Sequence, residues 1–270
     1  MMNESMIEAY LKRIQITEPA SVSESFLFRL QEAHLKNIPY ENIDILNREP
    51  VGSLEPDHLF DKIVTRKRGG YCFELNGLFA ELLRSMGFQV QEYFGRWHFG
   101  ESISIPRRRH RILKVNVPDS GRAFLVDAGV GCDCPRQPLL FQEDLEQERN
   151  GRIYRVVQNP QLGFVVQVKD KGCFVPYYSF TEDPHYPWDF DYVHYYCCTA
   201  QDSVFRQKLF AHRYTDFGRI NIENPEKDVF ILRQTTADGS LEETPVSGIK
   251  KLQDALNEHF GISCNLQFKN

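Results

Sequence analysis

The spacing of apolar side chains divides the chain into a helical first part, a strand-rich middle and a mixed end. In residues 1–87, apolar positions recur at intervals of three and four, which is the period of an amphipathic helix. This spacing predicts helices over the segments 7–14, 26–34, 59–64 and 73–86. The last of these is the most regular, and Gly87 follows it in the position of a left-handed C-cap.

The start of the segment 73–86 is set by the residues in front of it. Arg68-Gly69-Gly70 cannot continue a helix cheaply, because glycine loses more conformational freedom on folding than other residues do. We therefore expect a turn at these residues and a helix that begins at or just after Tyr71-Cys72. Cys72 then lies at a helix N-terminus.

From Phe88 to about Phe180 the apolar period falls to two, which is typical of half-buried strands. Strand-like runs follow one another at 88–97, 111–117, 123–130, 152–158, 164–170 and 173–180. Because no long helix separates them, they predict a barrel or a strongly curved antiparallel sheet. The pairs Asp183-Pro184 and Pro187-Trp188 mark the end of this region.

The remainder of the chain combines both patterns. It predicts a helix near 203–212, strands around Ile220 and Val229–Arg233, a hairpin turn at Asp238-Gly239 and a last helix over 249–260. The predicted fold class is thus α+β, with a helical region at 1–87, a β region at 88–190 and a mixed α/β region at 191–270.

Composition narrows the class of protein. The 270 residues are 41% hydrophobic and 26% charged, as expected of a folded globular chain rather than a disordered one. A net charge of -5 argues against a nucleic-acid partner, and the basic runs 66–68 and 107–109 are interpreted as solvated faces. No apolar stretch reaches the ~18 residues of a membrane span, and MMNESMIEAYLKR lacks the apolar core of a signal peptide. We therefore expect a cytoplasmic protein without a membrane partner.

The seven cysteines do not form the regular pattern of a disulfide framework, and an odd number leaves at least one thiol free. Cys132-x-Cys134 and Cys197-Cys198 lack the second CxxC or the paired histidines of a structural zinc site, so no metal site is predicted. Aromatic residues make up 13% of the chain, which fits an aromatic-lined cavity and a large aromatic core equally well.

Cys72 is the first candidate for chemistry. A thiol at a helix N-terminus faces the positive end of the helix dipole, which favours the thiolate. An ordinary thiol of pKa near 8.5 is only ~3% ionised at pH 7, whereas a pKa of about 5.5, reached with help from a cationic histidine, gives almost complete ionisation. The alternative is a buried and inert cysteine that begins a helix.

A nucleophilic thiol needs a base, and the base needs a group that fixes its tautomer. His110 opens the strand-like run 111–117, and Asp127 follows the run AFLV; the turn at 118–121 makes the two runs neighbours. Both side chains are then expected at one end of a sheet. The alternatives are a surface histidine in an arginine-rich loop and an aspartate that caps the turn at Gly129.

Taken together, these segments resemble the arylamine N-acetyltransferase family. The resemblance rests on RGGYCFELNGLF (68–79), HRIL (110–113) and VDAGVG (126–131), in that order. IPYENID (38–44), PRQPL (135–139) and TAQDSVF (199–205) extend it across the chain. It implies an N-terminal helical bundle, a central antiparallel β-barrel and a C-terminal α/β lid around a cysteine-protease-like core.

The resemblance also implies a reaction. Cys72 is the nucleophile that takes the acetyl group from acetyl-CoA, His110 the base and Asp127 its orienting carboxylate. The acetyl group then passes in a ping-pong reaction to an arylamine, an arylhydrazine or a similar small amine. Acetyl-CoA is a co-substrate, and no tightly bound cofactor is expected. The oligomeric state is left open.

The same resemblance implies binding residues. CoA is expected near Trp97, Gly129, Val130 and Gly131, and Tyr40 and Val130 are expected to line the amine pocket. Val130 departs from the aromatic residue that many relatives have between these glycines, which removes a surface on which an arylamine stacks. In YVHYYCCTA, His194 stands where the family pattern has asparagine.

Two other functions use parts of the same pattern. A thiol hydrolase or transglutaminase-like enzyme also orders Cys, His and Asp in this way, although VDAGVG followed by PRQPL is not expected in one. A non-catalytic small-molecule-binding protein on the same scaffold would have no use for an intact set of Cys72, His110 and Asp127.

Overall fold

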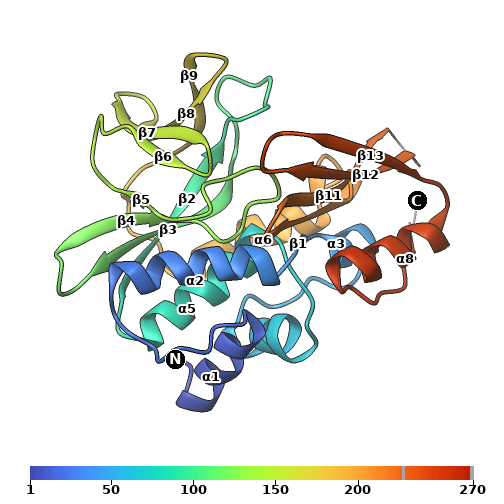
Figure 1. Cartoon of the computed structure of the whole chain (residues 1–270), viewed down its shortest axis with the longest axis horizontal. Coiled ribbons are helices and arrows are strands. Elements are labelled where there is room, and N and C mark those ends of the chain that lie inside the picture. The colour runs from blue at the N-terminus through green and yellow to red at the C-terminus, as the bar shows by residue number, and fades with distance from the viewer. Residues whose placement is uncertain (227–228, 268–270) are drawn as a thin grey trace.

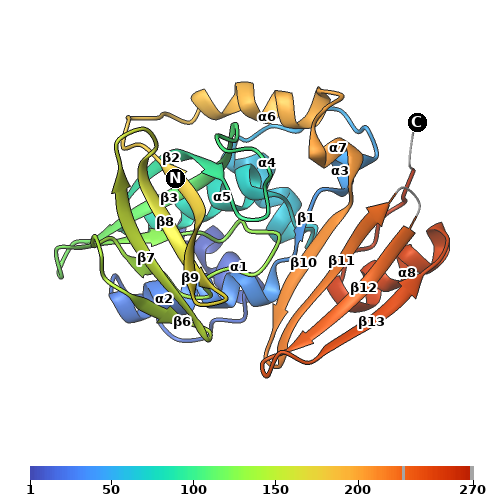
Figure 2. The same ribbon diagram turned by 90° about the horizontal axis from the view of Figure 1, so that it is seen from above.

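The computed structural model describes residues 1–226 and 229–267 and confirms the predicted α+β class (Figures 1 and 2). The helices are α1 (Glu4–Arg13), α2 (Glu24–Asn37), α3 (Ile43–Leu46), α4 (Pro56–Phe60), the π-helical turn η1 (Asp61–Thr65), α5 (Cys72–Ser85), α6 (Asp189–Thr199), α7 (Val204–Gln207) and α8 (Ile249–Phe260). The strands are β1 (Tyr40–Glu41), β2 (Gln89–Trp97), β3 (Arg108–Val117), β4 (Arg122–Val126), β5 (Leu139–Leu140), β6 (Gln147–Arg149), β7 (Arg152–Asn159), β8 (Gly163–Asp170), β9 (Cys173–Phe180), β10 (Phe210–Thr215), β11 (Gly218–Glu226), β12 (Val229–Thr236) and β13 (Leu241–Val246).

Helices α1 and α2 each begin where a side chain accepts one of the first free N–H groups. Asn3 accepts the Met6 N–H at the start of α1 (3.0 Å), and Ser23 accepts the Phe26 N–H at the start of α2 (3.3 Å). Helix α5 begins at Cys72, as predicted. Just past its end, Gly87 has a φ of 102°, the left-handed region that favours glycine at this position.

The predicted antiparallel β region forms a nearly closed barrel. Its strands are hydrogen-bonded in the order β5-β4-β3-β2-β9-β8-β7-β6. The two edge strands are joined through a side chain: Gln147 on β6 accepts the Leu140 N–H with Oε1 (2.7 Å) and donates from Nε2 to the Leu140 carbonyl (2.9 Å). Because this amide imitates a backbone pair, it covers an edge that would otherwise stay open.

Strands β10 to β13 form a second antiparallel sheet at the other end of the molecule, with α8 packed on one face (Figures 1 and 2). The short strand β1 from the N-terminal part pairs with the edge strand β10, Tyr40 opposite His212. This pairing fixes the second sheet to the segment that carries Tyr40, which lines the site described below. A core of Ile222, Leu232, Leu252 and Leu256 holds α8 against the sheet.

Two sequence-based expectations are wrong in the C-terminal part. The segment 203–212 is helical only over Val204–Gln207, and Phe210 already begins β10, which pairs with β1 on one side and with β11 on the other. The helix α6 was not predicted at all. It runs along one side of the molecule between the barrel and α7 (Figure 2).

No helix of the described residues is long and apolar enough to cross a membrane.

Candidate active site

Most of the residues singled out in the sequence line one cavity of about 170 Å³. Those that do so are Tyr40, Cys72, Trp97, His110, Gly129, Val130 and Gly131. Cys72 is the first residue of α5 and is only 2% exposed. Its Sγ lies 3.7 Å from the carbonyl oxygen of Arg109 on β3, so the start of the helix faces the N-terminal end of that strand.

His110 and Asp127 meet as the strand pattern predicts. The hairpin of β3 and β4 turns at 118–121, and Nε2 of His110 donates to Oδ2 of Asp127 at 2.7 Å. Both side chains are buried, which strengthens the hydrogen bond and excludes a surface histidine. The turn-capping alternative for Asp127 is also realised, because this carboxylate accepts the Gly129 N–H as well as the His110 Nε2–H. Because Asp127 occupies Nε2, Nδ1 is the nitrogen that remains to accept a proton.

Asn76 holds the carboxylate of Asp127 in place, and it was not identified from the sequence. It lies one helical turn after Cys72 and donates from Nδ2 to Asp127 Oδ1 (2.8 Å), while its Oδ1 accepts the Ala128 N–H (2.8 Å). The Gly129 N–H donates to the same Asp127 oxygen (3.1 Å). Helix α5 therefore positions both the thiol and the carboxylate.

Gln31 on α2 supports the same turn from the other side and was also missed. Its Oε1 accepts the Asp127 N–H (3.1 Å), and its Nε2 donates to the carbonyl of Pro135 (2.9 Å). The only local signal was that Gln31 follows Leu30 on the buried side of a predicted helix, where a polar residue requires partners.

The two glycines after Asp127 permit close approach. A Cβ on Gly129 would lie 2.8 Å from the Cα of Cys72, and a Cβ on Gly131 would lie 2.5 Å from Cε1 of Tyr40. Neither residue has a φ in the left-handed region. What these positions require is therefore space for the start of α5 and for the Tyr40 ring.

Aromatic rings form one wall of the cavity. The Trp97 ring meets the imidazole of His110 edge to face, with ring centroids 5.4 Å apart. Its Nε1 donates to the Phe99 carbonyl (2.8 Å), which fixes the indole. The aromatic excess in the sequence thus serves both functions considered: a few rings line the cavity, and most, such as Phe73 and Phe79, are buried in the core.

The expected lowering of the Cys72 pKa does not follow from the helix N-terminus alone. Burial raises the pKa of this thiol well above its usual range, and the neighbouring Cys197 acts in the same direction. Hydrogen bonds from the backbone at Arg111 and Phe73 lower it but do not offset burial. A thiolate at this position therefore depends on a proton acceptor in the same cavity.

Residues 25–268 match the sequence profile of a family described as N-acetyltransferase. An arylamine N-acetyltransferase of Mycobacterium tuberculosis is 32% identical over 259 residues, which cover 95% of this chain and 89% of the relative. The chain belongs to the arylamine N-acetyltransferase family. A Salmonella typhimurium relative, named arylamine N-acetyltransferase / N-hydroxyarylamine O-acetyltransferase, is 29% identical and covers 97% of this chain and 90% of its own length.

Solved structures of arylamine N-acetyltransferases have the same fold. That of the Salmonella typhimurium enzyme superposes with a TM-score of 0.87 at 28% identity, covering 98% of this chain and 93% of the other. That of Mycobacterium marinum arylamine N-acetyltransferase in complex with CoA gives 0.85 at 28% identity, covering 95% and 93%. The chain is therefore an acyltransferase of this family, and the reading as a thiol hydrolase or transglutaminase-like enzyme loses its support.

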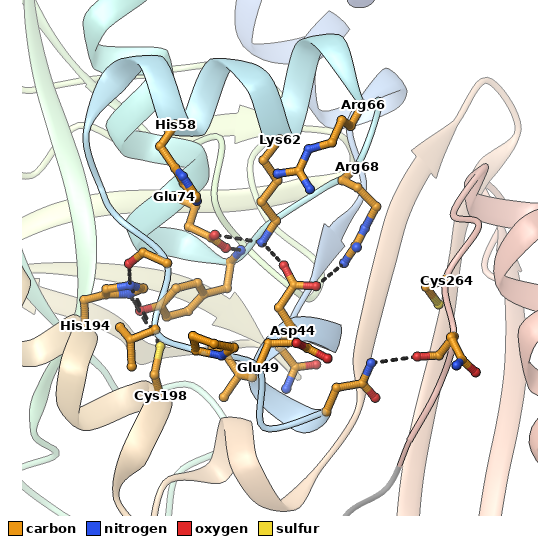
Figure 3. A pocket seen from close by; sticks show the side chains of 18 residues that line it. Asp44, Glu49, His58, Lys62, Arg66, Arg68, Glu74, His194, Cys198 and Cys264 are labelled. Carbon is orange, nitrogen blue, oxygen red and sulfur yellow. Dashed lines mark hydrogen bonds and ion pairs between the residues drawn. The ribbon is translucent and has the colours of Figure 1, made fainter.

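A second cavity, of about 400 Å³, has Tyr71 in its lining. It also contains His194, the other departure from the arylamine N-acetyltransferase pattern (Figure 3). His194 of α6 lines it rather than the cavity of Cys72. Its Nε2 donates to the Gly52 carbonyl (2.9 Å), so its Nδ1 accepts the hydroxyl proton of Tyr71 (2.6 Å). His194 is thus hydrogen-bonded to the residue directly before Cys72 and is not among the residues that line the cavity of Cys72.

Figure 3 also shows a buried ionic network that fixes the start of α5. Lys62 pairs with Glu74 at 2.7 Å and with Asp44 at 2.8 Å, and Arg68 reaches the other oxygen of Asp44 at 2.8 Å. Glu74 in turn accepts the Tyr71 N–H (3.1 Å), as in a capping box. The Arg68-Gly69-Gly70 turn and the first turn of α5 are therefore held by one set of charges.

Proposed function

We propose that this protein moves an acetyl group from acetyl-CoA to an arylamine, an arylhydrazine or a similar small amine, through a thioester on Cys72. The observation that carries the proposal is that the buried thiol of Cys72 and the imidazole of His110 line one cavity. Nε2 of this imidazole donates to the buried carboxylate of Asp127. Family membership and the CoA complex of the Mycobacterium marinum relative support the donor.

In the first half-reaction His110 acts as the base. Nδ1 accepts the proton of the Cys72 thiol, and the sulfur attacks the thioester carbonyl of acetyl-CoA. The bond to the CoA sulfur breaks, the CoA thiolate takes the proton back from His110, and acetyl-Cys72 remains. One thioester replaces another, so the step is nearly balanced in energy. The N–H groups in the first turn of α5 supply positive charge for the oxyanion.

In the second half-reaction the amine enters the space that CoA has left. Its nitrogen attacks the acetyl carbon, its proton passes to Nδ1 of His110, and the bond to the Cys72 sulfur breaks. The sulfur recovers the proton, and the amide leaves. Because an amide is more stable than a thioester, this step draws the cycle forward. Asp127 stabilises the imidazolium that forms in both halves.

Different residues of the cavity lining are assigned to the two substrates. We assign Trp97, Gly129, Val130 and Gly131 to the acetyl-CoA thioester arm, and Tyr40 with Val130 to the amine. In support, the Tyr40 ring lies against Gly131, and both line the cavity of Cys72. The side chain of Val130 is aliphatic, so stacking on the amine falls to the other rings that line the cavity, which are Tyr40, Trp97, Phe205 and Phe210.

The decisive test is the covalent intermediate. The protein is incubated with acetyl-CoA and no amine, and intact mass with peptide mapping is expected to find one acetyl group on Cys72. Addition of an arylamine should then remove it with formation of the amide. Cys72→Ala should remain unmodified, whereas Cys132→Ala, which alters another thiol of the same cavity, should still be acetylated.

The same experiment separates transfer from hydrolysis. A thiol hydrolase would lose the acetyl group to water at the same rate with and without amine. An adduct on another cysteine, or full activity in Cys72→Ala, would remove Cys72 from the mechanism.

A further inference from the structure

The strand that carries His110 contains an irregularity next to the site. In the β2–β3 ladder, His110 lies opposite Gly95 and Arg108 lies opposite Arg96, so Arg109 is an extra residue on β3. In a regular strand, neighbouring side chains point to opposite faces, whereas a bulge sets two residues against one and re-aims a side chain. Both Arg109 and His110 line the cavity of Cys72.

The bulge brings charge into a cavity that is otherwise mostly apolar. Among the described residues that line it, Arg109 is the one arginine or lysine and Glu101 the one carboxylate. The guanidinium of Arg109 is ion-paired with Glu101, and the two side chains are 21% and 26% exposed. Both residues also line an outer groove of about 660 Å³ that continues from the cavity. The pair therefore borders both the cavity of Cys72 and this groove.

We propose that Arg109 makes this enzyme selective for acceptor amines that bear an anionic group, such as a carboxylate on the aromatic ring, and that Glu101 holds the guanidinium until such an acceptor binds. The inference rests on the proposed function and names its acceptor class. An arginine pairs with carboxylates in a bidentate geometry, so the acceptor carboxylate replaces a partner of the same kind.

An anionic acceptor can replace Glu101 as the partner of Arg109 because the released Glu101 carboxylate becomes hydrated. Glu101 lies in the connection between β2 and β3, whose residues Ile103 and Ile105 are 61% and 44% exposed, so its carboxylate is rehydrated when released. A neutral acceptor offers the guanidinium no replacement, and it must enter beside an intact ion pair that it partly desolvates. The selectivity is the resulting difference in binding free energy between the anionic and the neutral acceptor.

The test compares 4-aminobenzoate with methyl 4-aminobenzoate, which have the same ring and differ in charge. The measured quantity is the ratio of their kcat/KM values, acid over ester, because the intrinsic reactivities of the two amines cancel when that ratio is compared between variants. Arg109→Gln is expected to lower the ratio about tenfold, the effect of one partly buried charge pair. Glu101→Gln should raise it several-fold, because the competing carboxylate is gone.

Arg107→Gln is the matched control. Arg107 belongs to the same basic run and lines the outer groove but not the cavity of Cys72, and it pairs with Asp202 (2.9 Å). It removes the same charge, and the ratio should stay at the wild-type value.

Equal losses for acid and ester in Arg109→Gln, a lower ratio in Glu101→Gln, or the same fall in Arg107→Gln would each overturn the proposal. Acetylation of Cys72 by acetyl-CoA, followed by mass, shows for every variant whether the first half-reaction is intact. If Cys72 of the wild type is not acetylated, the proposed function is wrong, and this result is distinct from a failure of the proposal for Arg109. If Arg109→Gln does not fold, the direction of change in Glu101→Gln decides.

Discussion

The carboxylate of Asp127 has two oxygens with different partners, and this difference predicts what an amide would do there. Oδ1 accepts from Asn76 Nδ2 and from the Gly129 N–H, while Oδ2 accepts from His110. In Asp127→Asn the two donors keep the amide oxygen on their side, so the NH2 group faces Nε2 of His110. The imidazole then carries its proton on Nδ1, the nitrogen that must accept one from Cys72.

We therefore expect Asp127→Asn to fold normally and to lose a factor of about 10³ to 10⁴ in kcat, the size of effect that a wrong tautomer causes in other triads. Steady-state transfer assays, with thermal unfolding as a check on the fold, measure this. Asp119→Asn, at the exposed turn of the same hairpin, is the control and should keep full activity. Near-normal turnover in Asp127→Asn would take Asp127 out of the triad.

The reactivity of Cys72 gives a second prediction at the same scale. Because burial raises the pKa of this thiol, its ionisation near pH 7 requires His110 as proton acceptor. In His110→Gln, alkylation of Cys72 by iodoacetamide should shift to higher pH than in the wild type. Peptide mapping follows it, and the exposed Cys173 serves as an internal reference that both proteins share. An unchanged pH profile would mean that the helix N-terminus suffices without the histidine.

What the sequence reveals at the residue scale depends on distance along the chain. Cys72, His110 and Asp127 are each marked locally, by a glycine turn before a helix or by the end of a strand. Asn76 and Gln31 carry no such mark, because their partners near Asp127 are 51 and 96 residues away. Side chains that position the site are recognised only when the fold brings those segments together.

At the scale of elements, the turn that follows β4 packs closely against the start of α5. A Cβ on Gly129 would meet the Cα of Cys72 and Nδ2 of Asn76, each at 2.8 Å, and backbone cannot yield as a flexible side chain does. We expect Gly129→Ala to lose about 1–3 kcal/mol in the free energy of unfolding. A displaced nucleophile should also lower kcat by about a hundredfold.

Urea unfolding and single-turnover acetylation of Cys72 measure the two effects. Gly52→Ala is the matched control, because its Cβ would meet only the imidazole of His58, the nearer atom at 3.2 Å, on an exposed side chain that can move. If Gly129→Ala reacts at the wild-type rate, close contact between these elements is not what sets the position of the nucleophile.

The elements that were predicted wrongly fail for physical reasons. Helix α6 buries Phe190, His194 and Cys197 at helical spacing, but one of these is a histidine, and Tyr192 and Tyr195 on the outside are aromatic and 81% and 62% exposed. The apolar residues of this segment therefore do not form a single face at helical spacing, and the pattern does not indicate a helix. The segment 210–215 is a strand because β1 and β11 supply partners from outside it, and this pairing overrides its local helical pattern.

On the scale of the whole molecule, two buried histidines tie stability to pH. Burial lowers the pKa of both His34 and His212 to about 3. His34 accepts the Tyr10 hydroxyl through Nδ1 (2.8 Å), and His212 lies in β10 opposite Tyr40. Each is held neutral in the folded chain, while the unfolded chain binds a proton with a pKa near 6.5.

The sign of the effect follows from these values. Between about pH 6.5 and pH 3 the unfolded state binds more protons, so stability falls as the pH falls through this window, by about 1.4 kcal/mol per pH unit for each histidine. Urea unfolding at pH 7.5, 6.0 and 5.2 should show the decline in the free energy of unfolding. These pH values lie above the range in which most carboxyl groups titrate. His212→Gln should remove about half of the part that His34 and His212 share, whereas His58→Gln, at an exposed position, should leave the slope unchanged. A slope that His212→Gln does not reduce would show that this histidine is protonated within the fold.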